Sequence, residues 1–495
     1  MEKAFLSGQS NSEAKPQEVA DSTWAEEAPG NGSQSFNETV PDDTKLEKRV
    51  KWKQDVRIIP FGAAIFLLAY FDRANIGNAK TLNANTKNDM ATETGMTNYQ
   101  FTIALMVFYA GYGAFEVPSN YFLKKLRPSR WIAILMFLWG ATSSCLAAVN
   151  NYPQVTGVRF VLGAAEAGLF PGLVYYLTFW YKTSERSIRV ALIYASAILS
   201  GAFGGALAYA IGHMQGVRKI SAWRWLFILE GLPSVVLSAA VWYWLPDFPE
   251  TVSWLTPEEK KLAVARLTTD GSKAHESNFT WKSAKSTLME LRLWAHYVVY
   301  FGPCVAFVAL SLFTPSIVLN LGYKGLDSQL MTVPPYAVGY CLTLLVSWSA
   351  DRYNARALHS ACCALLSASG YGASAALPAN AYKSRYGCLI IAASGTFACI
   401  PPLLGWLSSN LFTTGSAGLA IALNITFSVP GQILGVWIYT AKEAPKGYPT
   451  GHWTNFGMML TCAAGCFGLR WYYIRQNAKL LREAPAGESV RIFAY

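Results

Sequence analysis

The chain has 495 residues, of which 52% are hydrophobic and only 14% are charged, and its formal net charge is +11 at neutral pH. Soluble domains carry about 25% charged residues, so this composition excludes an ordinary water-soluble enzyme. The Lys and Arg residues stand at the ends of apolar runs, where they act as topology signals, and this placement argues against a nucleic-acid partner.

The N-terminal segment is predicted to be a disordered cytosolic tail over residues 1–53. It is rich in Glu, Ser and Asn to about residue 45, a composition that cannot bury enough apolar surface to fold. It also has no basic start followed by an apolar run, the pattern of a cleaved signal peptide. Two glycosylation sequons, at Asn31 and Asn37, are therefore expected to stay unmodified.

Apolar runs of about 20 residues follow, which is the length that spans a bilayer. They predict an all-α integral membrane protein with twelve transmembrane helices in two six-helix bundles, at residues 54–246 and 293–478. The lipid bilayer is thus an expected partner. In chain order the predicted spans are 57–78, 99–123, 131–149, 153–179, 188–214, 223–246, 293–318, 330–350, 357–377, 385–409, 416–440 and 453–475.

The polar insert at residues 247–292 is predicted to be a cytosolic linker with one amphipathic helix. Thr256 as N-cap, Pro257 at the first helical position and Glu259 at the third form a helix-start signature. Residues 479–495 are predicted to be a second cytosolic tail.

Orientation follows from the basic residues of the short loops. The loops after the second and fourth spans carry several Lys and Arg residues, whereas the loop at 150–154 carries none. Both termini are therefore expected in the cytosol. The plasma membrane is the expected location. In the second half the pattern is weak, because Arg352 and Arg356 inside are opposed by Lys383 and Arg385 outside. For the second half, the even number of predicted helices sets the orientation.

Ionisable side chains within apolar spans mark the expected transport path. Each costs about 2.5–3.5 kcal/mol to insert, so it usually faces a cavity or a partner. The clear cases all lie in the first half: Asp72, Arg73, Glu116, Arg159 and Glu166. Function is therefore predicted to concentrate in that half.

The spacing of these residues suggests proton chemistry. Arg159 and Glu166 are seven residues apart, about two helical turns or 10.5 Å along one face, so they do not touch directly. A carboxylate in a semi-dry cavity near a guanidinium can exchange a proton near neutral pH, as a proton-coupled carrier requires. A structural ion network is the alternative interpretation. Asp72 and Arg73 point about 100° apart, so one can face the cavity and the other a neighbouring helix.

Several motifs resemble the major facilitator superfamily, and within it the anion:cation symporter family that includes fungal allantoate, nicotinate and pantothenate permeases. The similarity runs from about residue 55 to 480. The motifs that carry it are 70–77 (YFDRANIG), 115–120 (FEVPSN), 159–168 (RFVLGAAEAG), 245–250 (LPDFPE) and 451–455 (GHWTN).

The resemblance implies alternating-access transport of a small organic anion, such as a vitamin acid or a ureide acid, coupled to protons. From the residues themselves we expect no enzymatic activity, no metal and no cofactor beyond the proton gradient, and a carrier that functions as a monomer, because one chain has enough helices for a complete carrier. The matching positions assign proton coupling to Asp72 and Glu166, with Arg73 as their electrostatic partner. The candidates for substrate binding are Arg73, Arg159, Tyr70 and Asn424, with Glu116, Asn75 and Gln432 as further possibilities. Proton coupling is the alternative role for Arg159.

A loop pattern of the superfamily, thought to latch the two halves in one state, is degraded in both halves. Asp351, Arg352 and Arg356 keep the acid and the bases in the second half, whereas Lys124 and Arg130 represent a first-half copy that lacks the acid.

Other functions stay open at this point. An efflux carrier for an acidic secondary metabolite and a non-transporting nutrient sensor would both keep the fold. A membrane-embedded enzyme is disfavoured, because the five His residues are scattered singly without metal spacing or a nucleophile motif.

Overall fold

The computed structural model describes residues 43–269, 285, 287–323, 326–411, 414–483 and 492–495. Residues 44–495 form one unit, in which the described residues contain helices and no strand. The α-helices are α1 (Asp43–Thr81), α2 (Met90–Glu93), α3 (Asn98–Lys125), α4 (Pro128–Cys145), α5 (Tyr152–Glu166), α6 (Leu169–Leu177), α7 (Thr183–Gly212), α8 (Ala222–Trp244), α9 (Pro257–Thr269), α11 (Leu291–Asn320), α12 (Asp327–Leu330), α13 (Val333–Arg352), α14 (Arg356–Ala376), α15 (Tyr382–Ser409), α16 (Thr414–Trp437) and α17 (Pro449–Glu483). Short 3₁₀ turns are η1 (Ala84–Thr86), η2 (Leu146–Ala148), η3 (Val217–Lys219) and η4 (Ala441–Lys446).

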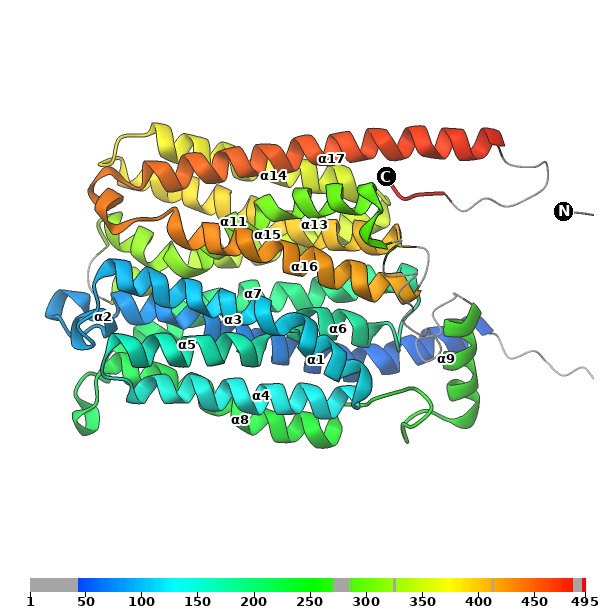
Figure 1. Ribbon diagram of the computed structural model, residues 1–495, viewed down its shortest axis with the longest axis horizontal. Helices are drawn as coiled ribbons and strands as arrows, with labels where there is room; N and C mark the ends of the chain where they lie inside the picture. The colour runs from blue at the N-terminus through cyan, green and yellow to red at the C-terminus, as the bar shows by residue number, and fades with distance from the viewer. Residues whose placement is uncertain (1–42, 270–284, 286, 324–325, 412–413, 484–491) are drawn as a thin grey trace, which may run out of the picture. The chain divides into compact units, whose positions relative to one another are not determined.

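The long helices follow the twelve predicted spans and run side by side, with α5 and α6 sharing one span (Figure 1). Within the described residues, ten helical segments are long and apolar enough to cross a membrane. The segments at α14 and α17 fall outside that set, because α14 is rich in Ala, Ser and Gly and the apolar middle of α17 is short, between polar residues at its start and Arg and Tyr residues from Arg470 onward. The all-α membrane fold predicted from the sequence is confirmed.

Helix α1 begins earlier than the apolar pattern predicts. The predicted tail ended at residue 53, but the helix already starts at Asp43, so the boundary of that tail is corrected. Residues 43–53 are mostly polar, so their hydropathy does not reveal the helix. Ion pairs hold the segment: Lys51 Nζ lies 2.8 Å from Glu185 and Lys53 Nζ lies 2.7 Å from Glu259. The remainder of the predicted tail, including Asn31 and Asn37, lies outside the described residues.

Helix α9 begins as the sequence predicts. The Thr256 amide donates to the Glu259 carboxylate at 3.0 Å, and the Glu259 amide donates to the Thr256 hydroxyl at 3.3 Å. This reciprocal pair is a capping box, which satisfies two amides that the first turn leaves without partners.

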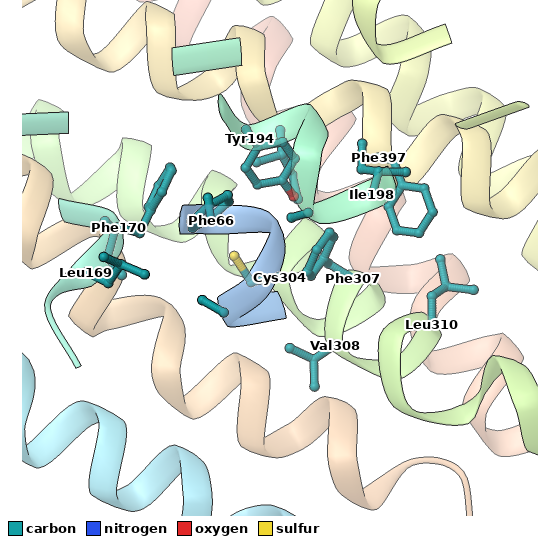
Figure 2. Packing of buried hydrophobic residues seen from close by; sticks show 14 of the residues in the cluster. Phe66, Leu169, Phe170, Tyr194, Ile198, Cys304, Phe307, Val308, Leu310 and Phe397 are labelled. Carbon is teal, nitrogen blue, oxygen red and sulfur yellow. The ribbon is translucent and has the colours of Figure 1, made fainter. Parts of the chain in front are cut away.

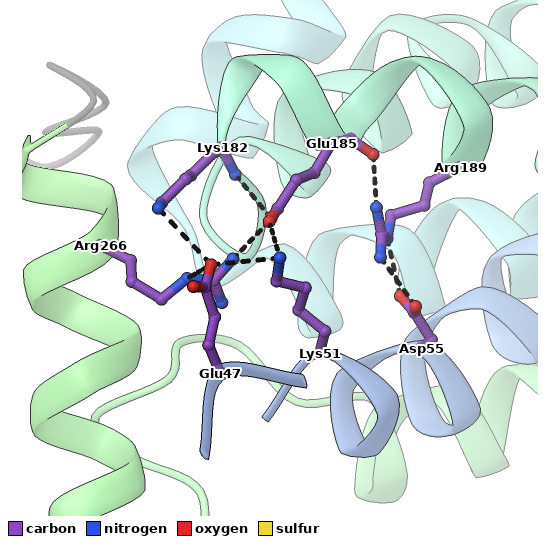
Figure 3. Close-up of polar contacts among 7 residues, drawn as sticks. All are labelled: Glu47, Lys51, Asp55, Lys182, Glu185, Arg189 and Arg266. Atoms are coloured by element: carbon purple, nitrogen blue, oxygen red, sulfur yellow. Dashed lines mark hydrogen bonds and ion pairs between the residues drawn. The ribbon is translucent and has the colours of Figure 1, made fainter. Parts of the chain in front are cut away.

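An ion-pair cluster ties α9 to the start of α1 and α7 (Figure 3). Glu185 binds both Lys51, at 2.8 Å, and Arg266 of α9, at 2.5 Å. Burial would raise the pKa of Glu185, but the hydrogen bond from Lys51 and the charge of Arg266 lower it below its ordinary value. Because the pKa of Glu185 is lowered in the folded protein, its ion pairs stabilise the fold at neutral pH. This stabilisation is lost as the pH falls through that pKa. The other members are Glu47, Asp55, Lys182 and Arg189.

The C-terminal residues pack on the last helices. Helix α17 continues to Glu483, past the predicted boundary at 478, because its polar last turns stay helical. The Phe493 amide donates to Asn477 and the Ala494 amide donates to Asn410, each at 2.8 Å. The described end of the predicted second tail is therefore bound to α17 and to Asn410, which directly follows α15.

The fourth predicted span is two helices, not one. Helix α5 ends at Glu166 and α6 begins at Leu169. Gly168 between them has φ +77, a left-handed conformation that favours glycine, and a Cβ there would lie 2.6 Å from the Ser119 hydroxyl oxygen. The break places the Glu166 carboxylate on the last residue of α5.

Helices α3 and α5 are in direct backbone contact at Gly163, where an added Cβ would lie only 2.0 Å from the Phe108 carbonyl oxygen. We therefore expect Gly163→Ala to force the helices apart and to cost about 1–3 kcal/mol of stability, as overpacking does. Thermal unfolding of the purified protein in detergent measures this loss. Gly157→Ala on the same helix is the matched control, because nothing lies within 4 Å of its Cβ position. Equal unfolding temperatures for the two variants would contradict the prediction.

The two bundles, α1 to α8 and α11 to α17, meet along α3 with α16 and along α7 with α13 and α15. Aromatic side chains fill the middle of this contact (Figure 2). Phe307 of α11 lies 5.7 Å from Tyr194 of α7 and 5.5 Å from Phe397 of α15, measured between ring centroids. At the end of the bundles where α1 stops, hereafter the Thr81 end, Gln329 donates to the Thr81 hydroxyl at 2.8 Å. The opposite end, which carries α9, is called the α9 end.

Candidate functional site

Arg73 and Glu166 form a buried ion pair between α1 and α5. The Arg73 Nη2 and Nε atoms donate to the same oxygen of Glu166, Oε2, at 2.9 and 3.1 Å. The other oxygen, Oε1, has no hydrogen-bond partner among the described residues. Arg73 is 7% exposed and Glu166 is fully buried, so the pair is shielded from water and its charges interact strongly.

Aromatic rings surround the guanidinium of Arg73. Its Cζ atom lies 4.6 Å from the ring centre of Tyr70, 4.9 Å from that of Tyr112 and 5.2 Å from that of Phe108. These cation–π contacts come from α1 and α3 and stabilise a positive charge without neutralising it. The guanidinium is therefore held by aromatic contacts as well as by Glu166.

Asp72 points away from this pair. Its carboxylate accepts hydrogen bonds from the Ser143 hydroxyl of α4 at 2.5 Å and from the Ser234 hydroxyl of α8 at 3.0 Å. The neighbours Asp72 and Arg73 therefore face different sides of α1, as their offset of about 100° around the helix predicts. Arg73 makes its ion pair with Glu166 and none with Asp72 in the described structure, so the expected partnership of Arg73 with both carboxylates is corrected to Glu166 alone.

Arg159 is fully buried on α5, and none of its three nitrogens has a hydrogen-bond partner among the described residues. Its guanidinium lies 4.6 Å from the ring centre of Phe108. Arg159 makes no direct contact with Glu166, in agreement with the spacing argument, and it is not among the residues that line the central pocket.

Glu230 of α8 is a buried carboxylate that the sequence argument missed. It is 3% exposed, and neither carboxylate oxygen has a partner among the described residues. The signal was available, because Glu230 is an acidic residue within the apolar run at 223–246.

We expect Asp72→Asn to destabilise the protein more than Glu230→Gln does. The Asp72 carboxylate accepts hydrogen bonds from two serine hydroxyls, and the NH2 group of Asn cannot accept one of them, which costs about 0.5–1.5 kcal/mol, whereas neither carboxylate oxygen of Glu230 has a hydrogen-bond partner among the described residues. Thermal unfolding of the two variants compares them directly. A larger loss for Glu230→Gln would contradict this account of the two carboxylates.

A narrow pocket with a free volume of about 40 Å³ lies between the bundles and brings Arg73 together with residues of the second bundle. Arg73 is the one charged residue among those that line it, and Ser311, Ser428, Gln432 and Cys304 supply further polar groups. The rest of its wall is mostly aromatic: Tyr70, Tyr109, Tyr112, Phe170, Tyr194, Tyr300 and Phe307.

The other predicted binding residues divide between the pocket and its surroundings. Tyr70 and Gln432 line the pocket, whereas Asn424 does not. Asn75 lines a separate small cavity between the bundles, which shares Ser311 with the central pocket. Glu116 accepts a hydrogen bond from Thr426 at 3.1 Å and so links α3 to α16 across the contact between the bundles.

The described contacts of the predicted latch residues lie within single bundles, and a latch between the bundles stays a prediction. The Asp351 carboxylate lies 2.8 Å from Arg356, which also donates to Ser409 at 2.5 Å, so these contacts stay within the second bundle. Arg352 is exposed. Arg130 lies over the ring of Trp242 at 5.7 Å, within the first bundle. The side chain of Lys124 lies outside the described part of the structure.

Comparison with known proteins gives one family and several relatives. The profile described as Major Facilitator Superfamily matches residues 62–436. The chain is 64% identical to the "MFS transporter prlL" of Fungal sp. (strain NRRL 50135), over 92% of each chain. It is 31% identical to a "Putative tartrate transporter" of Agrobacterium vitis, over 86% of this chain and 93% of that one. Among solved structures, the proton:xylose symporter XylE matches with a TM-score of 0.67 at 15% identity, over 85% of this chain and 96% of that one.

Proposed function

The chain belongs to the major facilitator superfamily, and from this premise we propose that it carries a small organic acid across the membrane together with a proton. Transporters of this kind move two bundles around a central site, so that the site opens to one side of the membrane at a time. One chain supplies both bundles, so we propose that it works as a monomer.

The observation that carries the proposal is the Arg73–Glu166 ion pair at the central pocket. A substrate carboxylate that binds Arg73 must displace the carboxylate of Glu166. Glu166 would then be a buried charge without its cation, which costs several kcal/mol unless it takes up a proton. Binding of the anion and uptake of one proton at Glu166 are thereby coupled, and the loaded carrier gains no net charge.

The wall of the pocket favours an acid with an apolar body. It has one guanidinium to pair with one carboxylate, and seven aromatic side chains form most of the remaining surface. Apolar pockets with few placed polar groups are typical of small-molecule sites. The relative named for tartrate refers to a hydroxylated dicarboxylate, which would need a second polar anchor. We therefore propose an aromatic or otherwise apolar monocarboxylate as the substrate.

Sidedness is part of the proposal. The start of α1, the α9 helix and the end of α17 lie at the same end of the structure (Figure 1). Basic side chains such as Lys51, Lys182 and Arg266 gather there. Because cytosolic loops carry an excess of Lys and Arg, we propose that the α9 end faces the cytosol, that both termini are cytosolic and that the protein lies in the plasma membrane.

Radiolabelled uptake tests the proposal. Cells that lack their own carriers would express the protein and be given nicotinate, pantothenate, allantoate, biotin or tartrate, with and without a protonophore. We expect one monocarboxylate with an apolar body to accumulate and the accumulation to collapse with the protonophore. Accumulation that the protonophore leaves unchanged would refute proton coupling, and transport of tartrate alone would refute the substrate class.

Two further outcomes address the alternatives. If the protein reaches the cell surface without supporting uptake, proteoliposomes preloaded with the same acids test export. Binding without transport in either direction would refute a carrier and favour a sensor.

A further inference from the structure

We propose that a second anion-binding site surrounds Arg385 at the Thr81 end of the second bundle and takes a small monocarboxylate. The site is a cavity with a free volume of about 350 Å³, separate from the central pocket. The choice of a carboxylate as the ligand rests on the proposed function, whereas the case for an anion rests on the cavity itself.

The cavity forms where three segments of the second bundle meet. Asn320 comes from the end of α11, Tyr382 and Arg385 come from the first turns of α15, and Tyr448 precedes α17. The Asn320 amide donates to the Tyr448 hydroxyl at 2.6 Å, which joins two of these segments. The two tyrosine rings give an apolar wall on which a ligand body can pack.

Arg385 is a buried cation without a counter-ion. It is 5% exposed, its Nη2 atom donates to the Gly447 carbonyl, and its Nε atom has no hydrogen-bond partner. No carboxylate forms an ion pair with it in the described part of the chain. Burying an unpaired charge costs several kcal/mol, and an anion in the cavity would offset that cost.

The backbone at Gly447 is shaped to admit the guanidinium. Gly447 has φ +77, and a Cβ at this position would lie 1.7 Å from Nη1 of Arg385. Only glycine therefore allows both this turn and the close approach of the cation. The carbonyl accepts one hydrogen bond and leaves the positive charge of Arg385 uncompensated.

Further basic residues lie next to the cavity-lining residues in the chain. Lys383 lies on α15 beside Arg385, and Lys442 and Lys446 belong to η4; all three lysines are exposed. The nearby acid, Glu443, already accepts hydrogen bonds from the Thr450 amide and hydroxyl, at 3.1 and 2.5 Å. These cations oppose the loop pattern expected on the outer side of a membrane protein. The positive-inside rule does not account for these basic residues, whereas binding of an anion does.

The cavity lies along the same helix as the central pocket. Ser311 of α11 lines the central pocket and Asn320 lines the Arg385 cavity, and nine residues of helix place them about 14 Å apart. An anion can therefore bind at Arg385 before it reaches Arg73.

Binding stoichiometry tests the second site, with radiolabelled benzoate as the probe and the full chain in nanodiscs. We expect the wild type to bind two benzoates per chain at saturation, and Arg385→Gln to bind one. The double variant Arg73→Gln/Glu166→Gln, which removes the central pair, is also expected to bind one. Neutral benzamide should not compete at either site.

A second variant leaves the cation intact. Ala379 lines the cavity in the loop before α15 and is half-buried, so Ala379→Trp should fill the cavity and remove one benzoate, whereas Ala379→Ser should keep both. Two benzoates on Arg385→Gln or on Ala379→Trp would overturn the proposal, as would none on the wild type. One benzoate on the wild type and none on Arg385→Gln would refute the central site and support this one.

Discussion

Glu166→Gln is expected to abolish proton-driven accumulation while leaving exchange of substrate across the membrane largely intact. The amide cannot take up or release a proton, so substrate binding at Arg73 is no longer tied to proton binding at position 166. For one coupled proton, a pH difference of one unit supports about tenfold accumulation. In the variant this ratio should fall to one, and uptake into proteoliposomes with an imposed pH gradient measures it.

Glu230→Gln is the matched control for this experiment. It also converts a buried carboxylate of the first bundle into an amide, but Glu230 lies on α8 and is not among the residues that line the central pocket. It should accumulate substrate as the wild type does. Glu166→Gln with an unchanged dependence of accumulation on pH would reject Glu166 as the proton site.

The cost of burying charge explains why part of the site was predictable. Arg73, Arg159 and Glu166 stand out as ionisable residues in apolar spans, and the structure finds all three buried. Their partners were not predictable in the same way. The Arg73–Glu166 contact joins residues 93 positions apart, and it depends on how α1 and α5 are rotated against each other.

The broken fourth span shows a limit of hydropathy. Both sides of Gly168 are apolar, so the run at 153–179 reads as one helix. The break depends on the left-handed backbone at Gly168 and on the side chain of Ser119 from α3, which only the folded structure brings together. Glu166 is consequently at a helix end, where its carboxylate can reach α1.

The aromatic character of the pocket was equally hidden. Aromatic residues make up 14% of the chain, so Tyr109, Tyr112 and Tyr194 look no different from ordinary core residues. Arg159 was predicted at the substrate, yet it lies against Phe108 outside the pocket lining. Packing between helices decides which face of a helix meets the cavity. The position of a residue along the chain does not reveal that face.

Arg73→Gln should be strongly destabilising, and adding Glu166→Gln should restore most of the lost stability without restoring transport. Removing one partner of a buried ion pair leaves the other charge unpaired and costs about 3–5 kcal/mol. The single variant strands the Glu166 carboxylate, which has no other hydrogen-bond partner among the described residues. The double variant removes both charges. Thermal unfolding measures the first effect, and uptake of the transported acid measures the second.

The combination separates a structural role from a functional one. If the pair served only to stabilise the fold, the double variant would recover transport together with stability. If Arg73 receives the substrate carboxylate, the double variant folds but fails to bind the acid. Arg73→Lys keeps a positive charge near Glu166 and should still weaken binding of the acid, because an ammonium cannot form a bidentate pair with a carboxylate. A double variant as unstable as Arg73→Gln would show that the cost lies in lost packing with Tyr70 and Tyr112, and the displacement mechanism would lose its basis.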